Sequence, residues 1–420
     1  MARDSKIHGV PLRFSFPPHP TAWVSREVHR QYVEGDDPIT AQPLMPEIID
    51  ALTKPLTEEE KHPVALKRPR RPRLLAPDTE DNLRRLFIKS GWTDGLPIIL
   101  PTEERVAEML TGTDHDPQEM IGRMSVTPHE EKLEYTVEKV AVNAVMAGAR
   151  PEHFPVILAM AATQRALFPS STGSWAHMVV INGPIRNQIG MNCGSSALSP
   201  FNLANSVIGR AGTLMTINFG DVNFSSNFTG AAGNGFNYNN LCCGENQERS
   251  PWEPFHVQKG FKAEESTVSL FRGWSMQGFS VGSQTGAAKS MVDLMRRMGF
   301  PVTFIVDPLV AKSLKDEGFD SKPKLGEYLV NEAKAAGSGG RGGRPMDAKG
   351  INFVVLGGEW NPVFMTSDFV YVQTEPIDKW IPKAGLKIDD PSYRMPAQAI
   401  CSEGVCGLDL YELAKEVEKK

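Results

Sequence analysis

The feature that most constrains the fold is an alternation of strand-like and helix-like segments through residues 266–372. Short apolar runs, such as 302–306 and 351–356, alternate with segments of helical spacing, such as 284–298 and 324–335. Parallel strands need a crossover connection, usually a helix, so this alternation indicates a mainly parallel sheet covered by helices. The sequence therefore predicts an α/β fold with a Rossmann-like C-terminal domain over residues 263–385.

Three further parts are predicted on either side of that domain. Residues 1–80 are rich in proline and charge, and predict an extended arm that wraps a neighbouring subunit or domain, or else a solvated tail. Residues 81–262 predict a larger α+β domain, with a helix at 137–147 and loops rich in Gly and Asn. Residues 386–420 are predicted to be a C-terminal tail.

Composition narrows the expected surroundings and partners. A net charge of −5 gives no reason to expect nucleic acid, and no apolar run approaches the length of a bilayer span. The polar N-terminus lacks the apolar segment of a signal peptide, and five cysteines are too few and odd in number for a disulfide framework. We therefore expect a cytoplasmic protein with reduced thiols. Its expected partners are a small-molecule substrate and further copies of itself, joined through the arm.

Cys193 is the first candidate for chemistry. It lies in a loop of glycines and polar residues, 190–196, where a thiol can be exposed near backbone donors that lower its pKa. Such a cysteine suits a nucleophile, a redox thiol or a metal ligand. A small, inert, buried cysteine is the alternative.

A metal site is the second possibility that the cysteines raise. Cys242 and Cys243 directly precede Gly244 and Glu245, and together with Cys193 they could supply a mixed set of ligands. The paired C-x-x-C units of a structural zinc site are missing. The cofactor therefore stays open, with a transition metal as one option.

His177 and two asparagines complete the predicted catalytic group. His177 immediately precedes a buried strand, 178–181, and its usual pKa suits a general acid or base near neutral pH. Asn192, beside the cysteine, is expected to orient reacting groups, and Asn182 to bind substrate. A structural histidine held by hydrogen bonds is the alternative for His177.

Glycine-rich strand ends predict where a substrate binds. Ligands of open α/β sheets bind outside the carboxyl ends of the strands, and glycines there let backbone N–H groups approach them. Gly273 and Ser275 follow one predicted strand, and Gly357 and Gly358 follow another. The glycines of residues 278–286 fit neither a dinucleotide fingerprint nor a phosphate-binding loop.

Several long runs of the sequence are distinctive. They are WTDGLP at 92–97, PTEERV at 101–106, EKVAVNAVMAG at 138–148, NGPI at 182–185, IGRA at 208–211, ENQERSPW at 245–252 and VLGG at 355–358. Together they resemble a bacterial family of UGSC-type (seleno)proteins. That family is named for a selenocysteine- or cysteine-Gly-Ser-Cys motif, which implies thiol or selenol redox chemistry. Here CGSS at 193–196 echoes the motif, but Ser196 stands where the second cysteine would be. A two-cysteine cycle within this motif is therefore in doubt.

These observations favour an enzyme, a thiol-dependent oxidoreductase acting on a small organic substrate. Its site would lie between the Gly/Asn-rich loops, 182–250, and the Rossmann-like segment, 266–375. A metal-dependent lyase or hydrolase is one alternative hypothesis. A non-catalytic subunit of a larger complex, with residues 1–80 as the assembly arm, is another.

Overall fold

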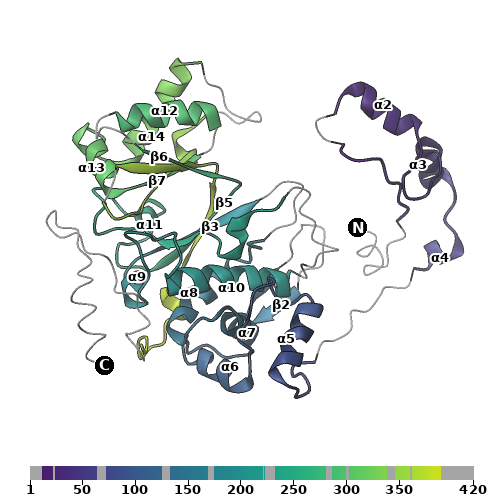
Figure 1. The fold of residues 1–420 in the computed structure, drawn as a ribbon, viewed down its shortest axis with the longest axis horizontal. Coiled ribbons are helices and arrows are strands. Elements are labelled where there is room, and N and C mark those ends of the chain that lie inside the picture. The colour runs from purple at the N-terminus through teal and green to yellow at the C-terminus, as the bar shows by residue number, and fades with distance from the viewer. Residues whose placement is uncertain are drawn as a thin grey trace. The chain divides into compact units, whose positions relative to one another are not determined.

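The computed structural model describes residues 12–21, 24–63, 72–124, 133–168, 175–220, 222, 232–280, 286–298, 302–337, 346–359 and 362–388 (Figure 1). The chain divides into two compact units, Met1–Pro77 and Asp78–Lys420. Helices and strands mix throughout the second unit, which confirms an α/β fold. No helix within these ranges is long and apolar enough to cross a membrane.

The first unit contains helices, where the sequence predicted an extended arm. They are α2 (Arg26–Glu34), α3 (Leu44–Thr53) and α4 (Glu58–Lys61). Arg13 holds the preceding stretch against them through a hydrogen bond of 2.7 Å from its Nε to Glu60. The short length of these helices and the prolines at 43 and 46 hide their periodicity in the sequence. In α3, the side chains of Met45, Ile49 and Leu52 share one face, because their spacing follows the helical turn.

The first sheet of the second unit has the strand order β10-β5-β3-β4. Its strands are β3 (Ala176–Asn182), β4 (Cys242–Gly244), β5 (Thr267–Gly273) and β10 (Val370–Pro376). Strands β3 and β4 are parallel, whereas β5 runs antiparallel to both β3 and β10. This sheet therefore takes strands from both the predicted 81–262 and the predicted 263–385 domains.

Helices α7 (Val137–Ala147), α8 (Phe154–Ala162) and α10 (Leu203–Phe219) cover one face of this sheet (Figure 1). Val179 and Leu270 point from the sheet into the buried cluster that these helices share. The bounds of α7 match the predicted helix, and Gly148, at a φ of 87°, ends it in the left-handed conformation.

The second sheet is mixed, where the sequence predicted a mainly parallel one. Its order is β6-β9-β7-β8, with β6 (Met276–Ser280), β7 (Val302–Val306), β8 (Ile351–Val355) and β9 (Val363–Ser367). Helices α13 (Pro308–Asp316) and α14 (Lys322–Ala335) connect β7 to β8, which are parallel. Strand β9 follows β8 after a short connection and pairs antiparallel with β7, and β6 pairs antiparallel with β9.

The two sheets pack face to face. Met178, Val180 and Phe271 of the first sheet share a buried cluster with Ile305 and Val354 of the second. Side chains alternate along each strand, so the neighbours of these residues point the opposite way. The outer face of the second sheet is covered by α12 (Ala287–Met298), α13 and α14. The second unit is thus layered as helices, sheet, sheet and helices (Figure 1).

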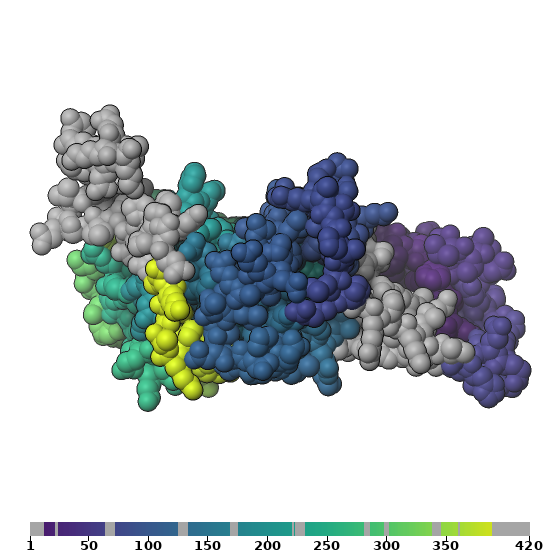
Figure 2. Space-filling view, turned by 90° about the horizontal axis from the view of Figure 1, so that it is seen from below, coloured from purple at the N-terminus to yellow at the C-terminus, as the bar shows by residue number. Residues whose placement is uncertain are grey.

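Shorter elements surround these layers. They are α5 (Glu80–Lys89), α6 (Glu103–Leu110), β1 (Met120–Met124), β2 (Leu133–Thr136), α9 (Ile185–Gln188), α11 (Phe255–Gln258) and 3-10 turns at Pro151–His153, Gly235–Tyr238, Ala348–Gly350 and Asp378–Trp380. The segment after β10, yellow in Figure 2, lies along the blue residues that follow α6. There Thr113 Oγ1 donates to the carbonyl oxygen of Trp380 at 2.9 Å. The N–H of Lys383 donates to Asp114 at 2.6 Å.

Candidate functional site

The carboxyl ends of strands from both sheets meet at one place. Asn182 ends β3, and Glu245 and Asn246 directly follow β4. The N–H of Asn246 donates to the carbonyl oxygen of Val355 at 2.8 Å, which joins the end of β4 to the end of β8. Both sheets are mixed, but β3 with β4 and β7 with β8 are parallel pairs, and α/β proteins bind ligands outside the carboxyl ends of parallel strands. This junction is therefore the candidate site.

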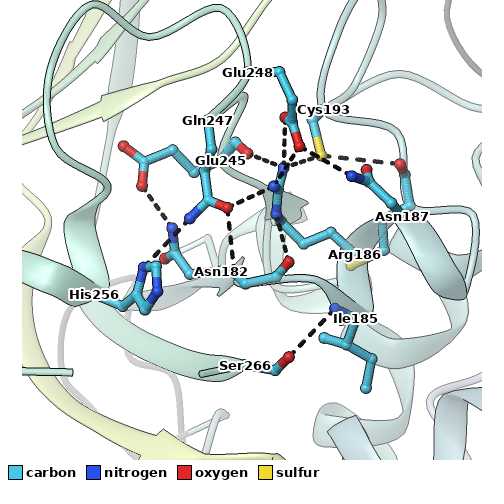
Figure 3. Close-up of polar contacts among 12 residues, drawn as sticks. Asn182, Ile185, Arg186, Asn187, Cys193, Glu245, Gln247, Glu248, His256 and Ser266 are labelled. Atoms are coloured by element: carbon cyan, nitrogen blue, oxygen red, sulfur yellow. Dashed lines mark hydrogen bonds and ion pairs between the residues drawn. The ribbon is translucent and has the colours of Figure 1, made fainter. Parts of the chain in front are cut away.

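Arg186 lies at the centre of the junction. It belongs to the short helix α9, which begins just after β3, and its side chain is only 2% exposed. Its guanidinium donates to the carbonyl oxygen of Gly183 at 3.0 Å and to Gln247 Oε1 at 2.5 Å (Figure 3). It also donates to Glu248 Oε1 at 2.9 Å and to the carbonyl oxygen of Glu245. Every branch of this buried cation therefore has an acceptor.

Cys193 contacts this guanidinium. Its Sγ lies 3.4 Å from Arg186 Nη1, and the residue is 1% exposed. A Cβ at Gly244 would lie 2.5 Å from the sulfur, so the glycine leaves the space that the thiol fills. Burial raises the pKa of Cys193, and the charge and hydrogen bond of Arg186 only partly oppose it. The expectation of an exposed thiol with a lowered pKa is therefore wrong for this arrangement.

Glu248 forms the exposed side of the cluster. Its side chain is 51% exposed, and Asn187 Nδ2 also donates to its Oε1 at 2.9 Å. Burial would raise the pKa of Glu248, but the hydrogen bond and charge of Arg186 outweigh it and lower the pKa. For Arg186, burial lowers the pKa, and Cys193 and Glu248 raise it by more. The pair is therefore ionised at neutral pH.

Glu245 is held on the other side of the junction by a second cation. Its carboxylate is fully buried and accepts from Lys322 Nζ of α14 at 2.6 Å. Asn182 Nδ2 and the N–H of Phe255 each donate to Oε2 at 2.6 Å. Both oxygens thus have donors, and the carboxylate ties the end of β4 to α14 and α11.

Asn192 shapes the loop that carries the thiol. Its Oδ1 accepts from the N–H of Gly194 at 2.9 Å, and its Nδ2 donates to the carbonyl oxygen of Ser195 at 2.8 Å. The same Nδ2 donates to Asn202 Oδ1 at 2.9 Å, while Asn205 bonds to the backbone of Asn192 on both sides. The side chain that we expected to orient reacting groups is therefore used within the loop.

Gly357 and Gly358 lie against the same loop, beside the thiol. The N–H of Gly357 donates to the carbonyl oxygen of Cys193 at 3.2 Å, and its φ of 131° favours glycine. A Cβ on Gly358 would lie 1.7 Å from Ser195 Oγ. The two glycines therefore serve a close approach of two backbones.

The remaining predicted residues lie at the opposite end of the first sheet. His177 is five residues before the end of β3, or about 16 Å along an extended strand. Its Nδ1 donates to the carbonyl oxygen of Leu167 at 2.8 Å, and burial lowers its pKa to about 4. Gly273 pairs with Ala176 at that same end, where the N–H of Ser275 donates to Asp368 at 2.9 Å. The structure therefore does not bring these three residues to Cys193.

The predicted metal ligands do not form a cluster. Cys242 belongs to the core beneath the helices, whereas Cys243 faces the space between the sheets. Burial raises the pKa of both thiols. In the described ranges, no group of three or more His, Cys, Asp or Glu side chains could hold a metal ion.

Two functional candidates were missed from the sequence. Arg186 and Lys322 are buried cations of the junction. Each lies in a short polar run of the sequence, a pattern that is typical of exposed residues. The position of Arg186 just after a buried strand is the one signal that could have found it. Searches against family models, curated proteins and solved structures found no match to this chain.

Proposed function

We propose that the chain is a thiol-dependent oxidoreductase that acts on a small organic substrate through Cys193. The observation that carries the proposal is the contact of 3.4 Å between the Arg186 guanidinium and Cys193 Sγ. A guanidinium beside a sulfur favours the thiolate, which is the nucleophilic form. Cys242 and Cys243 are buried as well, and burial raises their pKa too. Unlike at Cys193, no neighbouring cation among the described residues opposes this effect.

The proposed step is an exchange between a thiolate and a small organic disulfide. Cys193 gives its proton to solvent, and the thiolate attacks one sulfur of the substrate. A bond forms between Cys193 Sγ and that sulfur, the substrate S–S bond breaks, and the second half leaves as a thiolate. Ser196 replaces the second cysteine of the motif, so a small thiol must resolve the mixed disulfide by the same exchange.

The surrounding fold supports such a site. The β7–α13–α14–β8 unit is the part that we propose to be Rossmann-like, because its parallel strands present Gly357 at their carboxyl edge. Cys193, Cys242 and Cys243 are free thiols, which fits the reducing cytoplasm that we propose as the location.

An assembly role for the first unit is the second proposal. The exposed fractions of Met45, Ile49 and Leu52 in α3 are 39%, 51% and 81%, which is unusual for a contiguous apolar face. We propose that this face joins copies of the chain into a homo-oligomer. The same face would suit the alternative of a subunit within a larger complex.

Thiol labelling tests the first proposal. Native protein is treated with 4,4′-dithiodipyridine from pH 6 to 9, and peptide mass analysis assigns the product to each cysteine. We expect Cys193 to react faster than Cys242 and Cys243, with a rate that rises with pH as its raised pKa requires. Equal rates for the three thiols at every pH would reject the proposal.

Two variants sharpen that test. Glu248→Gln keeps the shape of an exposed side chain and removes a negative charge that raises the pKa of Cys193. The labelling rate of Cys193 in this variant should rise by roughly 2- to 10-fold at neutral pH. Cys193→Ser should abolish turnover of any substrate found, and full activity in this variant would remove the thiol from the mechanism. Near-stoichiometric metal in the purified protein would favour the metal-dependent alternative.

A further inference from the structure

Glu248 is the exposed end of the cluster that Arg186 forms with Cys193. The Arg186 side chain is 2% exposed, whereas the Glu248 side chain that neutralises it is 51% exposed. The cation of this pair is therefore inside the protein, and the anion is at the surface. A molecule that approaches the pair from solvent meets the negative charge first.

The Glu248 carboxylate and the Cys193 sulfur share one donor. Arg186 Nη1 lies 3.3 Å from Glu248 Oε2 and 3.4 Å from Cys193 Sγ (Figure 3). Two further donors, Arg186 Nη2 and Asn187 Nδ2, each lie 2.9 Å from Glu248 Oε1 and hold the carboxylate in this position. Glu248 is thus a fixed negative charge beside the thiol.

Other charged groups around the junction form pairs of their own. Glu245 is fully buried and its carboxylate binds Lys322, so neither charge is presented to solvent. Arg249 and Glu359 are partly exposed, and Arg249 Nη1 lies 3.7 Å from Glu359 Oε2. Each of these two pairs has a net charge of zero, so they do not offset the charge beside the thiol.

Ionisation of the thiol makes the cluster negative. The charges of Arg186 and Glu248 cancel while Cys193 is protonated. When Cys193 becomes the thiolate, the three groups together carry one net negative charge. A cationic group on an approaching molecule is then attracted, and an anionic group is repelled.

We propose that Glu248 selects disulfides that carry an ammonium group close to the sulfur. The proposal rests on the proposed function of Cys193 and names the class of its substrate. The ammonium binds the exposed carboxylate, and the Cys193 thiolate, whose proton has gone to solvent, attacks the adjacent sulfur. A bond forms between Cys193 Sγ and that sulfur, the substrate S–S bond breaks, and the other half leaves as an aminothiolate.

Three small disulfides of different charge test this assignment on the full-length protein. Cystamine carries two ammonium groups, 3,3′-dithiodipropionate carries two carboxylates, and 2-hydroxyethyl disulfide is uncharged. Each is added at pH 7.5 and low ionic strength, and peptide mass analysis after acid quenching gives the rate of modification at Cys193. The deciding quantity is the ratio of the cystamine rate to the dithiodipropionate rate, compared between the native protein and Glu248→Gln.

This ratio isolates selection from reactivity. Any change that Glu248→Gln makes to the thiol itself affects both rates equally, and the chemistry of each disulfide is the same with both proteins. We expect the ratio to fall by roughly 3- to 10-fold in Glu248→Gln, because a charge beside the sulfur attracts one reagent and repels the other.

A matched control removes the same charge elsewhere. Glu332 is exposed on α14, ten residues or about 15 Å along the helix from Lys322, and Glu332→Gln should leave the ratio unchanged. If Cys193 reacts but the ratio is the same in Glu248→Gln as in the native protein, or falls equally in Glu332→Gln, only the selection by Glu248 is overturned. If none of the three disulfides modifies Cys193, the proposed function falls, and this proposal falls with it.

Discussion

The buried ion pair between Lys322 and Glu245 permits a direct test of how the junction is held together. Their side chains are 2% and 0% exposed, and the charged atoms lie 2.6 Å apart. Lys322→Met keeps the apolar stem but leaves the Glu245 carboxylate buried with only neutral donors, from Asn182, Phe255 and Val355. Removing one partner of a buried pair costs about 3–5 kcal/mol, so we expect a loss of unfolding free energy in that range.

A matched control lies on the same helix. Lys324 pairs with Asp320 at 3.1 Å, and both side chains are more than half exposed. Lys324→Met should cost at most about 0.5 kcal/mol, since exposed pairs contribute little. The double variant Lys322→Met with Glu245→Gln should be more stable than Lys322→Met alone, because it buries no unpaired charge.

Urea unfolding followed by circular dichroism measures these differences, provided that the slope with urea is unchanged between variants. The reasoning fails if Lys322→Met costs no more than Lys324→Met. It also fails if Glu245→Gln makes the Lys322→Met protein less stable, since the stranded charge would then not be the cause.

Two other outcomes are expected. His153 and His177 have pKa values lowered to about 4 by burial. The unfolded chain binds protons first as pH falls below about 6.5, so each histidine should lower the unfolding free energy by about 2 kcal/mol by pH 5. His177→Asn should halve this acid loss, and an identical pH slope in the variant would contradict the assignment. Deleting residues 1–75, or introducing Leu52→Glu, should reduce the mass measured by light scattering; an unchanged oligomer would reject assembly through α3.

The sequence predicts the elements whose pattern is local. Helix α7 and strand β7 have the predicted bounds, because apolar spacing, a cap position and a following glycine act within a few residues. Strands β6 and β9 were missed, since β6 is largely exposed and contains Gly278. These two strands pair antiparallel and make the second sheet mixed. The alternation of strands and helices along the chain does not reveal the direction in which strands pair.

For the candidate site, the sequence predicts which residues meet better than it predicts whether they are buried. Cys193 and Gly357 do meet at the carboxyl edges of strands, as their places after buried segments suggest. Burial of the thiol depends on Arg186 and Gly244, which come from other parts of the chain. His177 is remote from Cys193 because it lies near the start of β3, whereas the junction is at the end of that strand. Each residue of an extended strand adds about 3.3 Å to this distance.

The connectivity of the first sheet has a consequence for which parts of the chain support the thiol loop. Strands β5 and β10 are adjacent, with Arg272 opposite Val370, so the chain leaves this sheet and returns to the same place. A Cβ on Gly273 would lie 2.7 Å from the backbone of Phe369, which shows how closely the exit and return strands approach. The whole second sheet therefore lies, in chain order, between two strands that are adjacent in the first sheet. Arg186 comes from the first sheet's side of the chain, whereas Gly357 comes from the segment between β5 and β10, so the thiol loop is supported by both parts at once.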